Sequence, residues 1–187
     1  MHHQTDSLND SEYFSIFPTC VGMYDLRLYH PAEEPKVKKY IDKELTEFET
    51  DKDVFDANEL LILKNSINDC IKAYSQEHGV DLYEIDESWY ERHTGTSEIQ
   101  NYPKGNFTGY YIANCFYDDA KFVINPPYKN PIMVPPNKTV SIYTAPDERF
   151  VCEAGRLLIV PAHLDRYFMV NDNKQIDTFA FTTKKSV

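Results

Sequence analysis

The sequence predicts a mainly β protein of the α+β class, in which antiparallel strands form a sandwich or barrel and two helices lie near the N-terminus. From Tyr83 onward, short runs rich in aromatic and β-branched residues alternate with clusters of Pro, Asn, Asp and Gly. Before Tyr83, two stretches repeat apolar residues at the spacing of an amphipathic helix. Because no helices separate the later strands, we expect the helices to pack outside one sheet.

The N-terminal part contains one predicted strand and two predicted helices. Residues 14–26 form a strand that Pro18 interrupts, which is typical of the edge of a sheet. Pro35 lies near the start of the first helix, and Asp56 or Asn58 caps the second. The apolar positions of the two helices are, in order, Val37, Tyr40, Ile41, Leu45 and Phe48, and Leu60, Leu63, Ile67, Ile71 and Tyr74.

Eight short strands are predicted in the remainder of the chain. They span residues 88–92, 107–116, 120–124, 139–144, 149–152, 157–160, 166–170 and 176–182. Five prolines between residues 126 and 136 predict a long ordered loop with extended backbone.

The chain length of 187 residues fits a single domain. Residues 1–12 are polar without periodicity, so we expect an arm that is extended or that orders only against a partner. The domain then covers 13–187, with the first strand and the helices in 13–82 and the β core in 83–187.

The charge and the cysteines limit the possible partners and location. A formal net charge of -11 opposes binding to nucleic acid and to anionic membranes, and the many tyrosines and phenylalanines suit protein–protein surfaces. No stretch approaches the roughly 20 apolar residues that span a bilayer. Cys20, Cys70, Cys115 and Cys152 form no CxxC pair, and the first residues lack the apolar run of a signal peptide. We therefore expect free thiols in a reducing cytoplasm, no secretion by a signal peptide, and protein or small-molecule partners.

The common catalytic motifs do not occur. The chain contains no Gly-x-Ser-x-Gly elbow, no phosphate-binding glycine loop, no dinucleotide glycine pattern and no His-Glu-x-x-His helix. We therefore assign no catalytic residue from these motifs.

Several short segments, taken in order, resemble a known family. They are Phe17-Pro18-Thr19 with Asp25-Leu26 after it, Ser88-Trp89, Thr108-Gly109-Tyr110-Tyr111-Ile112, Asn125-Pro126-Pro127, the segment from Gly155 to Arg166, and Phe179-Ala180-Phe181. These segments resemble Fe(II)/2-oxoglutarate oxygenases that are frequent in phages, notably those of marine cyanobacteria. The resemblance covers residues 88–182 and, loosely, 14–26. It implies a double-stranded β-helix, a cupin-like jelly roll, with the N-terminal helices packed on one sheet.

In the resembled family, two histidines of a His-x-His-Pro segment and a third after a Pro-Ser-Trp-Leu bend hold the iron, and an arginine on the last strand holds 2-oxoglutarate. The resemblance places Gln100, Tyr102 and Arg166 at the three ligand positions, and no arginine stands near Gln175 and Ile176. A guanidinium has no lone pair to donate and stays charged. At about 4 Å and an effective dielectric of about 20, it repels a divalent ion by roughly 8 kcal/mol. We therefore expect no iron or other cofactor, and the residues that would bind a cosubstrate are unknown.

Two other interpretations remain open. His163 and Asp165 form a His-x-Asp pair, and with a third ligand from His93 or Glu91 they are candidate ligands of a displaced iron site. Fe(II) and 2-oxoglutarate would then be cofactors of an active hydroxylase. Against this, the pair stands at the tryptophan of the resembled bend, which favours a solvent-facing His163 and a locally paired Asp165. Alternatively, Arg166 is a fixed cation that binds a small carboxylate or phosphate ligand.

The sequence therefore predicts a non-catalytic, oxygenase-like jelly roll that acts through protein–protein contacts. The phage resemblance implies a structural component of the virion, in the tail, neck or capsid surface. Its partners would be other phage structural proteins or copies of itself, and its location the virion or the host cytoplasm.

Overall fold

A computed structural model describes residues 11–16, 19–27, 34–44, 53–98, 105–115, 119–125, 147–171 and 174–186. Several predictions lie outside the described residues. They are the first ten residues of the arm, the helix positions Leu45 and Phe48, the proline-rich loop of 126–136, the strand of 139–144, and the positions Gln100 and Tyr102.

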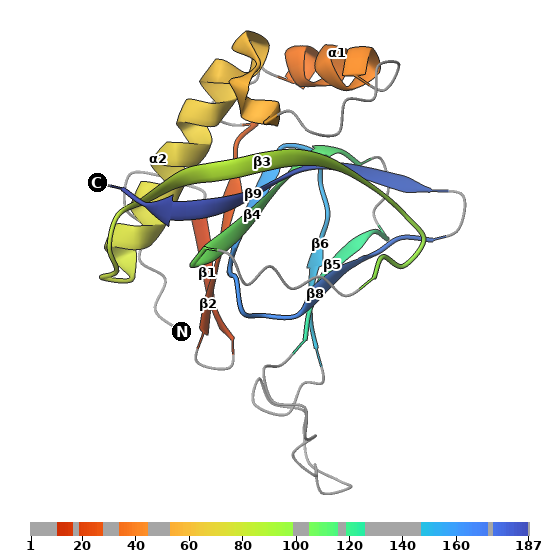
Figure 1. The fold of residues 1–187 in the computed structure, drawn as a ribbon. Helices are drawn as coiled ribbons and strands as arrows, with labels where there is room; N and C mark the ends of the chain where they lie inside the picture. Colours follow the sequence, from red (N-terminus) through yellow and green to blue (C-terminus); the bar gives the residue numbers. More distant parts are fainter. Residues whose placement is uncertain are drawn as a thin grey trace, which may run out of the picture.

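The described strands form two antiparallel sheets (Figure 1). The six-stranded sheet has the order β1-β2-β7-β4-β9-β3 and the three-stranded sheet the order β6-β5-β8. The bounds are β1 (Ser11–Ile16), β2 (Thr19–Asp25), β3 (Tyr83–Thr94), β4 (Phe107–Asn114), β5 (Lys121–Ile124), β6 (Glu148–Val151), β7 (Arg156–Pro161), β8 (Arg166–Met169) and β9 (Gln175–Lys185). In the six-stranded sheet β7 lies between β2 and β4, and β9 lies between β4 and β3, so strands far apart in sequence become neighbours, as in a jelly roll. The predicted fold class is confirmed.

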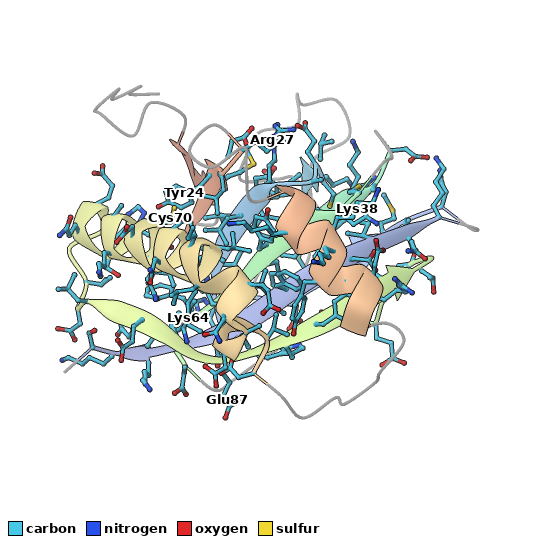
Figure 2. The ribbon with its side chains drawn as sticks, turned by 90° about the horizontal axis from the view of Figure 1, so that it is seen from above. Tyr24, Arg27, Lys38, Lys64, Cys70 and Glu87 are labelled. Atoms are coloured by element: carbon cyan, nitrogen blue, oxygen red, sulfur yellow. The ribbon has the colours of Figure 1, made fainter. Side chains whose placement is uncertain are left out.

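Two helices cover the outer face of the six-stranded sheet (Figures 1 and 2). They are α1 (Glu34–Glu44) and α2 (Leu61–Glu77), and the short 3₁₀ turns η1 (Val54–Asp56) and η2 (Asn58–Leu60) precede α2. The predicted helices and their placement are confirmed. In the described part of the chain, no helix is long and apolar enough to cross a membrane.

The predicted cap of the second helix is wrong. Asp56 and Asn58 belong to the two 3₁₀ turns, and the N-cap residue of α2 is Leu60, which makes no side-chain capping bond. Asp53 caps η1 instead, where its carboxylate accepts the amide hydrogen of Phe55. A residue that favours helix caps also favours short turns, so its type alone does not locate the helix start.

The single strand predicted for 14–26 is a hairpin. Pairing between β1 and β2 runs from Ser11↔Tyr24 to Ile16↔Thr19, so the strand begins two residues inside the segment predicted as the arm. β1 lies at the edge of the six-stranded sheet, as the proline pattern predicted. The sequence pattern does not distinguish a hairpin from one interrupted strand, because a turn and an interruption have the same composition.

The six-stranded sheet separates two hydrophobic cores. The outer core joins the helices to the sheet and contains the predicted stripe of α2, with Leu63, Ile67, Ile71 and Tyr74 all buried. Gly109 on β4 faces this core, and a Cβ there would lie 1.9 Å from the Phe181 ring. The fold therefore requires glycine at this position.

The inner core lies between the two sheets. Side chains alternate along β4, so Tyr110 and Ile112 point into the inner core while Tyr111 points into the outer one. The three-stranded sheet contributes Phe122, Ile124, Phe150 and Phe168. Burying each such side chain stabilises the fold by roughly 1.5–3 kcal/mol. The inner core also surrounds the candidate site.

Candidate functional site

The site lies at the bend that joins β7 to β8. The apolar strand β7 ends at Pro161, and the amide of Leu164 donates to the Pro161 carbonyl to form a tight turn. Arg166 is the first residue of β8 and pairs with Ile124 of β5. Because Ile124 and Phe168 point into the inner core, the alternation along β8 directs Arg166 there as well.

Arg166 is fully buried, with 0% of its surface exposed. Its Nε donates to the Tyr110 hydroxyl at 2.8 Å, and its Nη1 donates to the carbonyls of Ala162 at 3.1 Å and Leu164 at 2.8 Å. Its guanidinium carbon also lies 5.5 Å from the centroid of the Tyr110 ring. The side chain therefore folds back and binds the carbonyls of its own bend.

Tyr110 links Arg166 to the aromatic side chains of the inner core. Its ring centroid lies 5.2 Å from that of Phe122 and 5.4 Å from that of Phe168. Burial raises the pKa of the Tyr110 phenol, the charge of Arg166 opposes this rise, and the charge of Glu91 adds to it. The phenol therefore stays protonated at neutral pH, and its oxygen accepts the Arg166 hydrogen bond.

The inward face of β3 contributes a second polar group, made of Trp89, Glu91 and His93. The Trp89 indole donates to Glu91 Oε1 at 2.6 Å, and His93 Nε2 lies 3.2 Å from Glu91 Oε2. The same Nε2 lies 3.2 Å from the Thr178 hydroxyl, and the imidazole stacks on Phe168 with 4.1 Å between ring centroids. A hydroxyl–histidine–carboxylate relay needs both ring nitrogens, and here both contacts use one. These contacts orient His93 but form no such relay.

The candidate iron ligands of the alternative interpretation occupy different environments. His93 is buried on β3, His163 is exposed in the turn after β7, and Asp165 is half-buried just before β8. The exposure of His163 confirms its predicted solvent-facing position. Among the described residues, no three His, Cys, Asp or Glu side chains gather where they could hold a metal ion. The structure therefore does not bring these three residues together.

Sequence reasoning missed a buried carboxylate on the outer face of β9. Asp177 is 0% exposed and accepts hydrogen bonds from Tyr90 at 2.5 Å, Arg92 at 2.7 Å, Asn114 at 3.0 Å and Gln175 at 3.4 Å. Burial acts to raise the pKa of Asp177, but the hydrogen bonds from Arg92, Tyr90 and Asn114 outweigh it and lower the pKa below its ordinary value. An aspartate inside an apolar strand was the one signal that could have indicated this group.

No family model and no curated protein matches this sequence. Among solved structures, the chain is similar to an oxidoreductase of the 2OG-Fe(II) oxygenase family from Burkholderia pseudomallei, with a TM-score of 0.50 and 11% identity over 70% of this chain and 59% of that chain. It is also similar to a prolyl-4-hydroxylase from Pseudomonas putida, with a TM-score of 0.56 and 7% identity over 89% of this chain and 93% of that chain. At these identities the likeness concerns the fold, and the chain spans 59% of the first protein's length. The predicted double-stranded β-helix is confirmed.

Proposed function

We propose that this chain is a non-catalytic protein that uses the oxygenase jelly roll as a scaffold and acts by contacting other proteins. The buried guanidinium of Arg166, at the bend where the resembled family has its third iron-binding histidine, is the observation that carries the proposal. The fold likeness to 2OG-Fe(II) oxygenases supports the scaffold.

The side chains around this bend do not fit an Fe(II) ion. Arg166 cannot donate a lone pair, stays positively charged, and is held by Tyr110, Ala162 and Leu164. The electrostatic repulsion of roughly 8 kcal/mol is a cost that a ligand set lacking its third histidine does not offset. Phe168 and Tyr110 occupy the adjoining space.

The last strand, β9, supports the further proposal that the chain does not bind the cosubstrate 2-oxoglutarate. Where the resemblance expects an arginine that holds 2-oxoglutarate, β9 carries Gln175 and Ile176. Gln175 contacts Asp177, and Ile176 belongs to the inner core. The next inward residue is Thr178, which contacts His93. None of these side chains offers the fixed cation that a dicarboxylate requires.

Exposed apolar side chains support a role in protein contact. Leu61 and Ile62 begin α2 with 53% and 44% of their surface exposed, and Val80 and Leu82 follow its end with 42% and 47% exposed. Contiguous exposed apolar patches mark contacts between proteins, so the proposal assigns partner contact to the two ends of α2 where these side chains lie in pairs. The acidic charge of the chain disfavours nucleic acid and anionic membranes as partners.

The finer part of the proposal is a place in a phage particle, in the tail, neck or capsid surface, with other structural proteins or further copies of this chain as partners. The segments that resemble phage proteins are its support. We expect mass spectrometry of purified particles to detect the chain at a constant ratio to the major structural proteins through successive purification steps. Loss of the chain during purification, with the structural proteins retained, would contradict a virion location.

The second candidate is an active oxygenase with displaced ligands, which the fold likeness favours. It requires His93, His163 and Asp165 to converge on one ion, and in the described part of the chain they do not. A third candidate, an anion site at Arg166, requires a cation that a ligand can reach, and this guanidinium is enclosed. Binding of Fe(II) or Mn(II) together with 2-oxoglutarate directly separates the oxygenase from the non-catalytic protein.

A further inference from the structure

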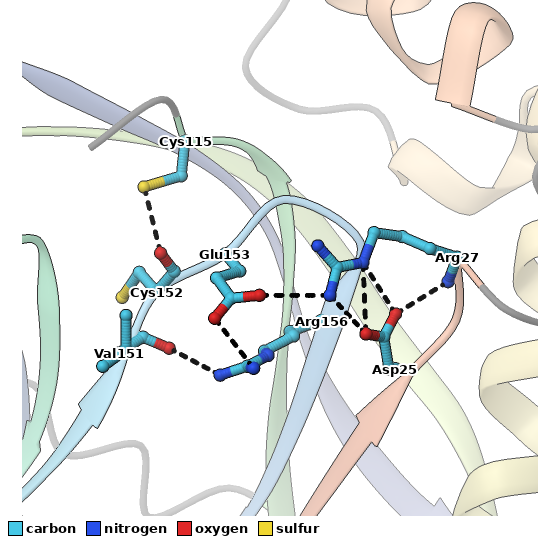
Figure 3. Close-up of polar contacts among 7 residues, drawn as sticks. All are labelled: Asp25, Arg27, Cys115, Val151, Cys152, Glu153 and Arg156. Atoms are coloured by element: carbon cyan, nitrogen blue, oxygen red, sulfur yellow. Dashed lines mark hydrogen bonds and ion pairs between the residues drawn. The ribbon is translucent and has the colours of Figure 1, made fainter. Parts of the chain in front are cut away.

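Two cysteines from different sheets lie side by side (Figure 3). Cys115 follows the last residue of β4 in the six-stranded sheet, and Cys152 follows the last residue of β6 in the three-stranded sheet. The Cys115 thiol donates to the Cys152 carbonyl oxygen at 3.3 Å. Both side chains belong to the inner core, with 9% and 2% of their surface exposed, and neither forms a disulfide.

We propose that Cys115 and Cys152 form an oxidative modification site, at which a peroxide converts the two thiols into a disulfide that joins the two sheets. One thiol loses its proton, the resulting thiolate sulfur attacks the peroxide, and the O–O bond breaks; the released hydroxide takes up that proton, so the products are a sulfenic acid and water. The second sulfur then attacks the sulfenic sulfur and releases a second water. Two thiols and one hydrogen peroxide thus give one disulfide and two waters, with sulfur oxidised and oxygen reduced.

The thiol–carbonyl contact places the two residues near the range that a disulfide spans. A carbonyl oxygen lies about 2.4 Å and a cysteine sulfur about 2.8 Å from the Cα of its own residue, so the 3.3 Å contact limits the separation of the Cys115 and Cys152 Cα atoms to about 8.5 Å at most. Each sulfur turns about its own Cα–Cβ bond, and disulfides join Cα atoms that are about 4.4–6.8 Å apart. The reaction therefore requires rotation of both side chains and, where the two Cα atoms start more than about 6.8 Å apart, a small shift of the backbone.

The backbone around Cys152 is held in place while its side chain turns. The Cys152 amide donates to the Ala120 carbonyl at 3.0 Å. The next residue, Glu153, accepts from Arg27 at 3.1 Å and from Arg156 at 2.8 Å, and these ion pairs tie the turn after β6 to the end of β2 (Figure 3). Contacts within the folded chain therefore keep the two cysteines adjacent.

Burial controls how fast the site reacts. Burial raises the pKa of the Cys152 thiol well above its usual range, so little thiolate is present at neutral pH. We expect slow oxidation that accelerates as the pH rises. Burial also raises the pKa of Cys70, to about 12, but Cys70 lies in the outer core on α2 (Figure 2). Cys70 therefore serves as a matched control.

The test treats the full chain with hydrogen peroxide, blocks the remaining thiols with an alkylating agent, and maps the unreduced peptides by mass spectrometry. We expect a peptide that links Cys115 to Cys152, formed with the loss of two hydrogen atoms and reversed by dithiothreitol. Cys70→Ser should retain this link, and Cys115→Ser and Cys152→Ser should each lose it. A link across 37 residues should raise the melting temperature by about 5–10 °C.

Two outcomes would overturn the proposal. One is oxidation that gives sulfenic or sulfinic acid, or leaves the thiols unchanged, without the 115–152 link. The other is a link that joins a different pair of cysteines or two chains. The peptide map of the unmodified sequence decides between these results, so the test does not depend on whether each variant folds.

Discussion

Arg166→Ala is expected to lower the free energy of unfolding by about 3–5 kcal/mol. The change removes a fully buried side chain and leaves a cavity beside Tyr110. It also leaves the carbonyls of Ala162 and Leu164 without their guanidinium donor, at a cost of about 1–3 kcal/mol for each buried group. Urea unfolding, followed by circular dichroism at one pH, measures the difference.

Two further variants separate packing from charge. Arg166→Met keeps most of the volume and removes the cation, so its cost should be clearly smaller than that of Arg166→Ala. His163→Ala, an exposed position in the same bend, should change the stability by less than about 0.5 kcal/mol. An Arg166→Ala variant as stable as His163→Ala would contradict the buried hydrogen-bonded position of the guanidinium.

Asp177→Asn should destabilise the fold by about 2–4 kcal/mol. The substitution keeps the shape of the side chain but removes the charge that Arg92 and Tyr90 contact at 2.7 Å and 2.5 Å. It also places amide hydrogens next to the side-chain amide of Asn114, which in the unmodified chain donates a hydrogen bond to the Asp177 carboxylate. Asp86→Asn is the matched control, because that carboxylate is exposed and its ion pair with Lys184 contributes little. Equal unfolding midpoints in urea for the two variants would be the contrary result.

The Asp177 carboxylate also predicts how the free energy of unfolding changes at low pH. The pKa of Asp177 in the folded chain is lower than its ordinary value near 3.8. Its stabilisation is therefore fully present above pH 3.8 and decreases as the pH falls through the lowered pKa. We expect the stability of the unmodified chain to drop below pH 4 more steeply than that of Asp177→Asn. Identical acid profiles from urea unfolding at several pH values would show that Asp177 does not cause this loss.

The elements with strong local patterns were predictable from the sequence. The stripe of α2 repeats at helical spacing, and β7 is a continuous apolar run that ends at a proline. The hairpin of β1 and β2 was missed because the pattern of 14–26 does not distinguish a broken strand from two paired strands. The cap of α2 was missed because two 3₁₀ turns precede the helix.

The contacts of the site depend on strand register. Local patterns in the sequence do not show which residues of two distant strands lie opposite each other. Arg92 and Asp177 are separated by 85 positions and meet because β3 pairs with β9 in one register. Arg166 could be identified as an unsuitable iron ligand from its chemistry alone. Its bond to Tyr110 needed the arrangement of β4 against β8, and its bonds to the carbonyls of Ala162 and Leu164 needed the conformation of the bend.

Thermal unfolding with added metal and cosubstrate tests most directly whether this jelly roll has lost its iron chemistry. The full chain is melted without oxygen in the presence of Fe(II) or Mn(II), of 2-oxoglutarate, and of both together. A ligand at about 100 times its dissociation constant stabilises a protein by roughly 2.7 kcal/mol, which for a chain of this size raises the melting temperature by about 5–10 °C. We predict no rise in any of the three conditions. A rise that requires both the metal and 2-oxoglutarate would contradict the non-catalytic assignment.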